Sequence, residues 1–264
     1  MNENVKNREI TEVLDDIRQE MGDTFLGKYI IHDFAGDFEV IKLEDPSEIA
    51  EYIDHTLLDP AADATQIREF CRGALEFKFA SICVNPNNVK AAFDIVASSG
   101  MEVCSVVGFP LGAHHAVIKA HEAELAIYDG ASEIDMVIDI GALKSRHFSI
   151  VYHDIYEVAT VCENQSATLK VIIETCKLNK HEKIAACLLS LAAGADYVKT
   201  STGMGGGGAT EEDITLMRQV VGPKLGVKAS GGIRNLESAM AMLKAGATRI
   251  GAGAGDNIAK EGQI

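Results

Sequence analysis

Eight short apolar segments recur along the chain from about residue 50, and longer segments with helical spacing of apolar residues separate them. These segments are Ile49–Ile53, Phe79–Val84, Val103–Val107, Ile134–Ile138, Leu169–Ile173, Tyr197–Val198, Leu225–Val227 and Arg249–Gly251. Most are apolar almost throughout, which is typical of parallel strands that are covered on both faces. Eight such units over roughly 214 residues predict a (β/α)8 TIM barrel, with a doubly wound open sheet as the alternative.

The segments between the strands carry apolar residues on one helical face. The expected helices are Ala64–Phe77, Pro86–Ser98, His115–Tyr128, Ser149–Glu163, Lys180–Ala193, Glu211–Val221 and Asn235–Ala245. We therefore assign residues 49–264 to the barrel and residues 1–48 to an acidic, partly helical N-terminal extension. Within this extension, Ile10–Met21 has the spacing of an amphipathic helix. A docking segment, an oligomer contact and a solvated extension all remain open as its role.

Composition excludes several classes of partner. The formal net charge is −15, so we expect neither a nucleic acid nor an anionic membrane as partner, because both need clustered Lys and Arg. A small phosphorylated substrate needs only one local site and stays possible. The first residues lack the pattern of a signal peptide, and the six cysteines are scattered singly. These features predict a cytoplasmic protein with reduced thiols and no metal site.

Two lysines close consecutive strand-like segments, and chemistry in a barrel takes place at that end of the strands. Lys199 ends ADYVK and Lys228 ends LGVK. Neighbouring buried ammonium groups repel each other, which favours a neutral amine that can condense with an aldehyde or ketone to a Schiff base. The alternative is a salt bridge from each lysine to a carboxylate such as Asp135 or Glu174. Spacing alone does not decide which lysine is the nucleophile.

An acidic residue and two glycine-rich loops complete the candidate site. Asp135 interrupts the apolar run Ile134–Ile138, where a carboxylate is costly unless it is paired or moves protons. The loop after Lys199 runs from Ser201 to Gly208, and Gly231 and Gly232 follow Lys228. Such loops after the late strands of a barrel present backbone N–H groups to anions. The combination indicates a phosphorylated carbonyl substrate.

Seven motifs in order resemble those of the deoxyribose-phosphate aldolase family of class I aldolases, from about residue 50 to residue 255. They are IDHTLL (53–58), ASICVNP (80–86), VVGFPLGAH (106–114), EIDMVIDIGALKS (133–145), LKVIIETC (169–176), ADYVKTSTG (195–203) and VKASGGIR (227–234). The resemblance implies that Lys199 forms the Schiff base, that Lys228 perturbs its pKa and that Asp135 shuttles protons.

The same resemblance implies reversible cleavage of 2-deoxy-D-ribose 5-phosphate to D-glyceraldehyde 3-phosphate and acetaldehyde, with no metal or organic cofactor. The expected partners are therefore a sugar phosphate and aldehydes, in a homodimer or another homo-oligomer. Substrate and phosphate binding would fall on five residues. They are Thr200, Gly203, Gly231, Gly232 and Gly253. A different Schiff-base aldolase, a phosphate-binding isomerase and a catalytically silent barrel are the competing interpretations.

The sequence departs from the family pattern at several positions. Gly253 and Ala254 stand where hydroxyl residues are common, and Asp59 and Asp139 stand where lysine and asparagine are common. We expect an acidic mouth that tolerates non-phosphorylated aldehydes. The chain printed here ends at Ile264, without the tyrosine-terminated tail of some members, so we expect no help from such a tail. Cys83 is a possible thiol at the site, although an inert buried cysteine is the simpler interpretation.

Overall fold

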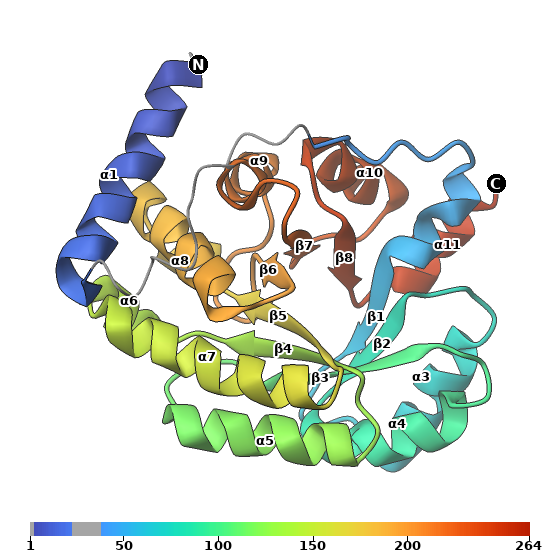
Figure 1. Cartoon of the computed structure of the whole chain (residues 1–264). Coiled ribbons are helices and arrows are strands. Elements are labelled where there is room, and N and C mark those ends of the chain that lie inside the picture. The colour runs from blue at the N-terminus through green and yellow to red at the C-terminus, as the bar shows by residue number, and fades with distance from the viewer. Residues whose placement is uncertain (1–2, 23–37) are drawn as a thin grey trace.

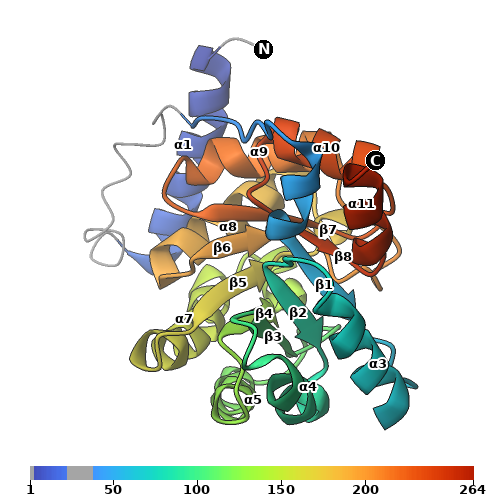
Figure 2. The same cartoon turned by 90° about the vertical axis from the view of Figure 1, so that its right-hand side faces the viewer.

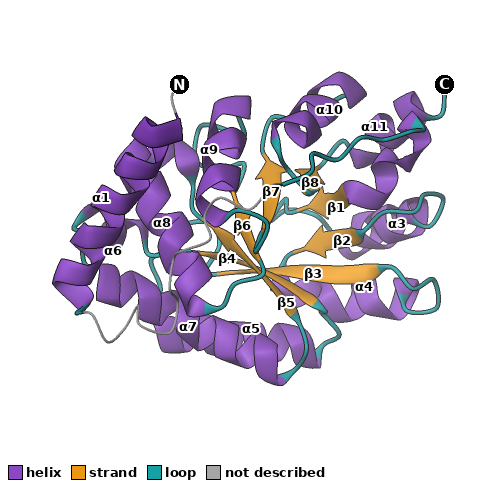
Figure 3. Cartoon of the chain, turned by 45° about the horizontal axis from the view of Figure 1, so that its top comes forward, coloured by secondary structure: helices purple, strands orange, loops and turns teal. Residues whose placement is uncertain are grey.

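The structure is a computed structural model, and it describes residues 3–22 and 38–264. Eight parallel strands form one closed barrel in chain order (Figures 1 and 3). The strands are β1 (Ile53–Leu57), β2 (Ser81–Val84), β3 (Glu102–Val107), β4 (Glu133–Val137), β5 (Thr168–Ile172), β6 (Tyr197–Lys199), β7 (Gly226–Ser230) and β8 (Arg249–Ala252). Because β1 pairs with β8, the predicted TIM barrel is confirmed and the open sheet is excluded.

Helices surround the barrel, as Figure 3 shows. They are α3 (Ala64–Ala74), α4 (Val89–Val96), α5 (Ala116–Tyr128), α6 (Ile140–Lys144), α7 (Phe148–Asn164), α8 (Lys180–Ala193), α9 (Glu211–Val221), α10 (Leu236–Ala245) and α11 (Gly255–Gly262), and α1 (Glu3–Met21) lies outside this ring. Short 3₁₀ turns are η1 (Pro46–Tyr52), η2 (Pro86–Asn88) and η3 (Thr175–Lys177). Among the described residues, no helix combines the length and the apolar character that a membrane span needs.

Local sequence signals fix the ends of several helices. Asn179 begins α8 with a capping box, in which its side chain accepts from the N–H of Glu182 and the Glu182 side chain accepts from the N–H of Asn179. Gly194 ends the same helix in a left-handed conformation with φ 90°, which glycine adopts without a steric penalty. These caps set α8 between β5 and β6, so that β6 returns to the barrel in parallel.

The first strand lies later in the chain than the apolar run predicted. Ile49 and Ala50 belong to the 3₁₀ turn η1, and β1 begins only at Ile53. The Asp45 side chain accepts from the N–H of Ser47 at 2.9 Å, and Pro46 occupies the first helical position. This cap starts a helical turn before the strand can begin. The expected strand at Ile49–Ile53 was therefore wrong for its first four residues.

The predicted helix Ile10–Met21 is present within α1, which lies along α8 and also contacts α7 (Figures 1 and 2). Its apolar stripe is buried in the main core. The members of this stripe are Ile10, Val13, Leu14 and Ile17. Polar contacts add to the apolar packing, since Asp16 lies 2.7 Å from Arg146 and 2.8 Å from His181. The helix is therefore part of the packed structure, and the interpretation as a solvated extension is wrong for it. Residues 23–37, for which the sequence predicted strand-like and turn-like pieces, lie outside the described residues.

Candidate active site

Strand register brings the charged side chains of the barrel together on its inner face. Asp135 of β4 pairs with Lys170 of β5, and Lys199 of β6 pairs with Lys228 of β7. Lys228 pairs in turn with Arg249 of β8. Since paired residues of parallel strands lie side by side on one face of the sheet, these groups meet inside the barrel.

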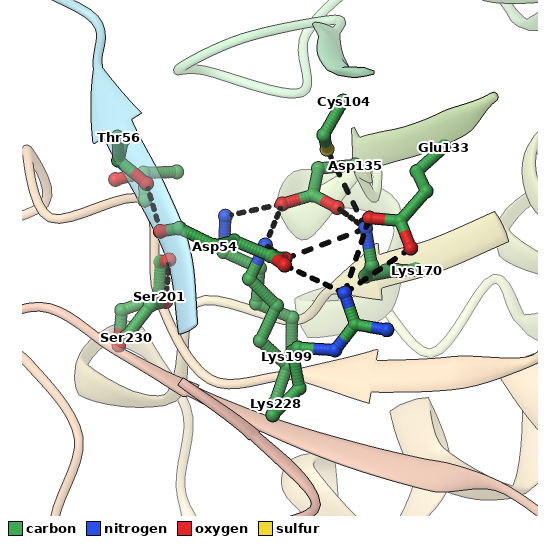
Figure 4. Close-up of polar contacts among 12 residues, drawn as sticks. Asp54, Thr56, Cys104, Glu133, Asp135, Lys170, Lys199, Ser201, Lys228 and Ser230 are labelled. Atoms are coloured by element: carbon green, nitrogen blue, oxygen red, sulfur yellow. Dashed lines mark hydrogen bonds and ion pairs between the residues drawn. The ribbon is translucent and has the colours of Figure 1, made fainter. Parts of the chain in front are cut away.

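Asp135 is the centre of the cluster (Figure 4). Its Oδ2 atom accepts from the Nζ atoms of both Lys199, at 2.7 Å, and Lys228, at 2.6 Å. Its Oδ1 atom accepts from Lys170 Nζ at 3.0 Å. The predicted lysine pair and the predicted aspartate thus lie in direct contact. Glu174, the other carboxylate considered as a partner for the lysines, instead bonds the loop after β6.

A second ring of charges lies beside this centre. Asp54 contacts Lys228 and Lys170 through Oδ2 and lies 2.6 Å from Arg249 through Oδ1. Glu133 lies 2.6 Å from Lys170 and 3.1 Å from Arg249. Both carboxylates are buried, and a buried charge of this kind is stabilised only when opposite charges surround it.

Neighbouring cations keep the carboxyl groups of Asp135 and Asp54 ionised. Burial alone would raise the pKa of Asp135, but the charges of Lys170, Lys199 and Lys228 outweigh it and hold that pKa well below its usual range. The pKa of Asp54 is likewise lowered, because Lys228, Lys170 and Arg249 outweigh its burial. Burial opposes the charge of Lys228, yet Asp135 and Asp54 raise its pKa above the ordinary value. Lys228 is therefore a permanent cation beside Lys199.

The contacts distinguish the lysines from one another. Lys170 contacts three carboxylates and Lys228 contacts two, whereas Lys199 has only the contact with Asp135 in the described part of the chain. Lys199 is also 3% exposed, while the other two lysines are fully buried. The lysine with the fewest carboxylate contacts is therefore also the accessible one.

Sequence reasoning missed four members of this cluster. They are Asp54, Glu133, Lys170 and Arg249. A signal was present for Lys170, which interrupts the apolar run LKVII just as Asp135 interrupts its own run. For Glu133, the spacing of two residues from Asp135 places both on one face of β4. Because the partners come from four different strands, only the closed barrel shows that these charges neutralise each other.

The glycine-rich loops lie against each other at the end of β6 and β7. A Cβ atom at Gly203 would lie 4.0 Å from the Cα of Gly231, and one at Gly208 would lie 2.2 Å from the Gly231 carbonyl oxygen. Gly203, Gly231 and Gly232 all have φ between 81° and 85°, where side chains are disfavoured. At these three positions the backbone carries no side chain, as an anion site made of N–H groups requires.

The other predicted contact residues lie nearby in different settings. The Thr200 hydroxyl donates to the Ser230 carbonyl oxygen at 3.1 Å and accepts from the Ser230 N–H at 3.0 Å, so it joins β6 to β7. Gly253 lies close to the backbone of Thr56, since a Cβ atom placed on Gly253 would lie 3.5 Å from the Thr56 carbonyl oxygen.

The two acids that we expected to make the mouth more acidic are hydrogen-bonded to nearby backbone N–H groups. Asp59 accepts from the N–H of Ala61 at 2.8 Å, and Asp139 caps α6 by accepting from the N–H of Ala142 at 2.9 Å.

Two thiols lie beside Asp135. Cys83 and Cys104 are paired in register across β2 and β3, both are fully buried, and one atom of each lies within 4.8 Å of a carboxylate oxygen of Asp135. A hydrogen bond from Cys104 lowers the pKa of the Cys83 thiol, whereas burial raises that of Cys104. Thiols and a carboxylate are potential metal ligands. Three ammonium groups already bond this carboxylate, however, and their charges disfavour the binding of a metal cation there. Cys83 is thus fully buried, and its sulfur lies next to the centre.

Comparisons with known proteins agree with this geometry. The family model described as DeoC/LacD family aldolase matches residues 49–261. The deoxyribose-phosphate aldolase of Clostridium perfringens is 53% identical over 210 residues, which cover 80% of this chain and 93% of the relative. That of Halalkalibacterium halodurans is 56% identical over 208 residues, covering 78% of this chain and 92% of the relative.

A solved structure extends the similarity to three dimensions. The tetrameric deoxyribose phosphate aldolase from Aeropyrum pernix superposes with a TM-score of 0.79 at 29% identity, over 94% of this chain and 97% of its own. The match of the family model and the relatives at more than half identity cover the barrel that carries the charged cluster. The chain therefore belongs to the DeoC/LacD family of aldolases.

Proposed function

We propose that this protein is a Schiff-base aldolase that reversibly cleaves 2-deoxy-D-ribose 5-phosphate to D-glyceraldehyde 3-phosphate and acetaldehyde. The proposal rests on one observation in particular. Among the three lysines that contact Asp135, Lys199 alone has no second carboxylate contact in the described part of the chain, and it is 3% exposed while the other two are fully buried. The names of the relatives supply the substrate class.

In the proposed reaction, the Lys199 nitrogen attacks the substrate carbonyl and water leaves, which gives a protonated imine. This imine accepts the electron pair of the breaking carbon–carbon bond, so the step needs no metal or organic cofactor. The hydroxyl proton on the departing fragment goes to a base, and D-glyceraldehyde 3-phosphate leaves. The remaining enamine takes up a proton on carbon, and water then releases acetaldehyde and restores the amine.

Asp135 and Lys228 would assist these proton transfers. The Asp135 Oδ2 atom lies within hydrogen-bond distance of both lysine nitrogens, which supports the passage of a proton between them. The charge of Lys228 disfavours a second positive charge on Lys199 and keeps that amine nucleophilic. The loops around Gly203 and Gly231 would hold the phosphate group, and the lack of side-chain hydroxyls at Gly253 and Ala254 supports weak discrimination for phosphate.

Trapping of the imine tests this proposal. Incubation with acetaldehyde and borohydride should leave one ethyl group on Lys199, mapped by mass spectrometry of peptides. Lys199→Met should carry no ethyl group on the corresponding peptide, and Lys228→Met should still react at Lys199, only more slowly. An adduct on Lys228, or no adduct on the wild-type protein, would refute the assignment. A comparison of kcat/KM for deoxyribose 5-phosphate and deoxyribose measures the preference for phosphate.

We also propose a homo-oligomer. The relative from Aeropyrum pernix is described as tetrameric, and α5 carries exposed apolar side chains at Val117, Leu125 and Tyr128, which are 66%, 52% and 85% exposed. Apolar side chains on one helix are typical of surfaces that meet another protein. Light scattering at several concentrations measures the mass in solution. A monomer at all concentrations would exclude this part of the proposal.

A further inference from the structure

Glu174 is a buried acid that the proposed mechanism does not use. It lies two residues after the end of β5, its side chain is almost fully buried, and its backbone is left-handed with φ 56° and ψ 64°. Only three described residues other than glycine have positive φ. Such a conformation costs free energy in a residue with a side chain, so other contacts must hold Glu174 in place.

The carboxylate of Glu174 bonds the loop that follows Lys199. It accepts from the N–H of Thr202, at 3.3 Å to Oε2 and 3.4 Å to Oε1, and from the hydroxyl of Thr202. The hydroxyl oxygen of Thr202 accepts in turn from the N–H of Met204 at 3.0 Å. Glu174 is thus bonded directly to Thr202 and, through the Thr202 hydroxyl, to the N–H of Met204.

The loop also lies directly on this side chain. A Cβ atom at Gly205 would lie 2.7 Å from the carboxylate carbon of Glu174, so only glycine fits there. Gly207 packs on Cys176 in the same way, with a Cβ position 2.5 Å from that of Cys176. The segment from Glu174 to Cys176 therefore packs directly against the glycine-rich loop, at Gly205 and Gly207.

Contacts from other parts of the structure hold the two ends of this loop, and Cys176 donates from Sγ to the carbonyl oxygen of Gly205 at 3.6 Å in between. At its start Ser230 donates to the carbonyl oxygen of Ser201, and at its end the N–H of Ala209 donates to the carbonyl oxygens of Ser230 and Gly231. Between these ends, glycine supplies five of the six residues from 203 to 208. A segment with so much glycine loses much conformational entropy when it becomes ordered. Glu174 opposes this loss by bonding Thr202, directly before the glycine-rich residues, and by packing against Gly205.

We propose that Glu174 is a positioning residue that orders the loop from Ser201 to Gly208 for the phosphate end of the substrate. This inference rests on the proposed function for the identity of that substrate. Glu174 acts through Thr202, because its carboxylate bonds both the N–H and the hydroxyl of Thr202, and that hydroxyl in turn holds the N–H of Met204. Its loss would loosen the phosphate site while Lys199 stays bonded to Asp135.

The test compares Glu174→Gln with wild type on a phosphorylated and a non-phosphorylated substrate. The amide keeps the size of the side chain but loses one acceptor and the negative charge. Loss of hydrogen bonds to a charged group predicts a KM for deoxyribose 5-phosphate that rises roughly 10-fold, with kcat within about 3-fold of wild type. For deoxyribose, kcat/KM should stay within about 2-fold, since no phosphate is bound.

Matched variants separate positioning from general damage. Thr202→Val removes the hydroxyl and should reproduce the rise in KM, whereas Thr202→Ser keeps it and should restore the wild-type value. Glu69→Gln, the same change at an exposed position on α3, should leave KM unaltered. An unchanged KM in Glu174→Gln, or an equal loss with both substrates, would overturn the inference.

Two independent readouts keep this inference distinct from the proposed function. Trapping with acetaldehyde and borohydride tests Lys199 in every variant without any phosphate. Titration with inorganic phosphate, followed by ³¹P NMR, tests the loop without any turnover, and its Kd should rise in Glu174→Gln. If wild type forms no adduct, the proposed function fails while the phosphate titration still decides on Glu174.

Discussion

Replacement of Lys228 by methionine should show how the cluster keeps Lys199 reactive. The change keeps most of the length of the side chain but removes the ammonium group. Burial opposes the charge of that group, and Asp135 and Asp54 keep it charged by raising its pKa. Lys199 would then be the only ammonium group on the Oδ2 atom of Asp135. We expect this carboxylate to hold Lys199 in the protonated, unreactive form.

The size of the effect follows from the geometry. Both ammonium nitrogens lie within 2.7 Å of the same oxygen, so they are no more than about 5 Å apart, and at an effective dielectric constant of about 20 their repulsion is about 3 kcal/mol. Each 1.36 kcal/mol corresponds to about a tenfold change in the fraction of free amine. The variant should therefore lose roughly 100-fold in kcat/KM at about pH 7.

The pH profile is the decisive measurement. The rate of D-glyceraldehyde 3-phosphate formation, coupled to a dehydrogenase, gives kcat/KM from about pH 6 to about pH 10. The loss in Lys228→Met should shrink as the pH rises, because more of Lys199 is then neutral. A loss of equal size at every pH would refute the reasoning, since it would point to a role of Lys228 other than its charge.

A matched variant controls for the loss of a buried cation. Lys170→Met also removes an ammonium group from Asp135, but from the other carboxylate oxygen, Oδ1. The part of its loss in kcat/KM that disappears as the pH rises should therefore be smaller than in Lys228→Met. Both variants leave buried carboxylates with fewer partners, which destabilises by about 3–5 kcal/mol. Urea unfolding of each variant gives the folded fraction, by which the rates are normalised.

Three further predictions concern stability. Burial lowers the pKa of His55 to about 4, so the folded state loses stability as the pH falls from about 6.5 towards 4. The loss between pH 7 and pH 5 should be about 2 kcal/mol. Urea midpoints of wild type and His55→Gln at both pH values measure this loss, and an equal loss in the two proteins would contradict the prediction. Lys119 and Asp154 form a buried pair at 2.6 Å, so Lys119→Met should cost about 3–5 kcal/mol, and joint replacement of Asp154 by leucine should recover most of it. Ile17→Ala should cost about 2–5 kcal/mol, because Ile17 is 1% exposed where α1 joins the core; no change in the urea midpoint would show that α1 is not packed in solution.

The sequence alone was sufficient to predict the barrel, and it singled out the two lysines and the aspartate that the structure brings into contact. Eight apolar runs separated by amphipathic segments encode parallel strands and helices locally, because burial on both faces leaves no alternation in a strand. Lys199, Lys228 and Asp135 were found because a charge in such a run is costly without a special reason. The prediction of the first strand was wrong at its start because it did not use a local signal, the helix start formed by Asp45 and Pro46.

Only the tertiary structure decided how these charges act together. Asp54, Lys170 and Arg249 come from strands far apart in the sequence, and strand register in a closed barrel brings them to one place. Their contacts determine which lysine has the fewest carboxylates around it, a property that spacing along the chain does not contain. The same holds for Glu174 beneath its glycine-rich loop, and for α1 on the barrel. Electrostatic balance and packing depend on distances in space, which the sequence specifies only once the whole chain has folded.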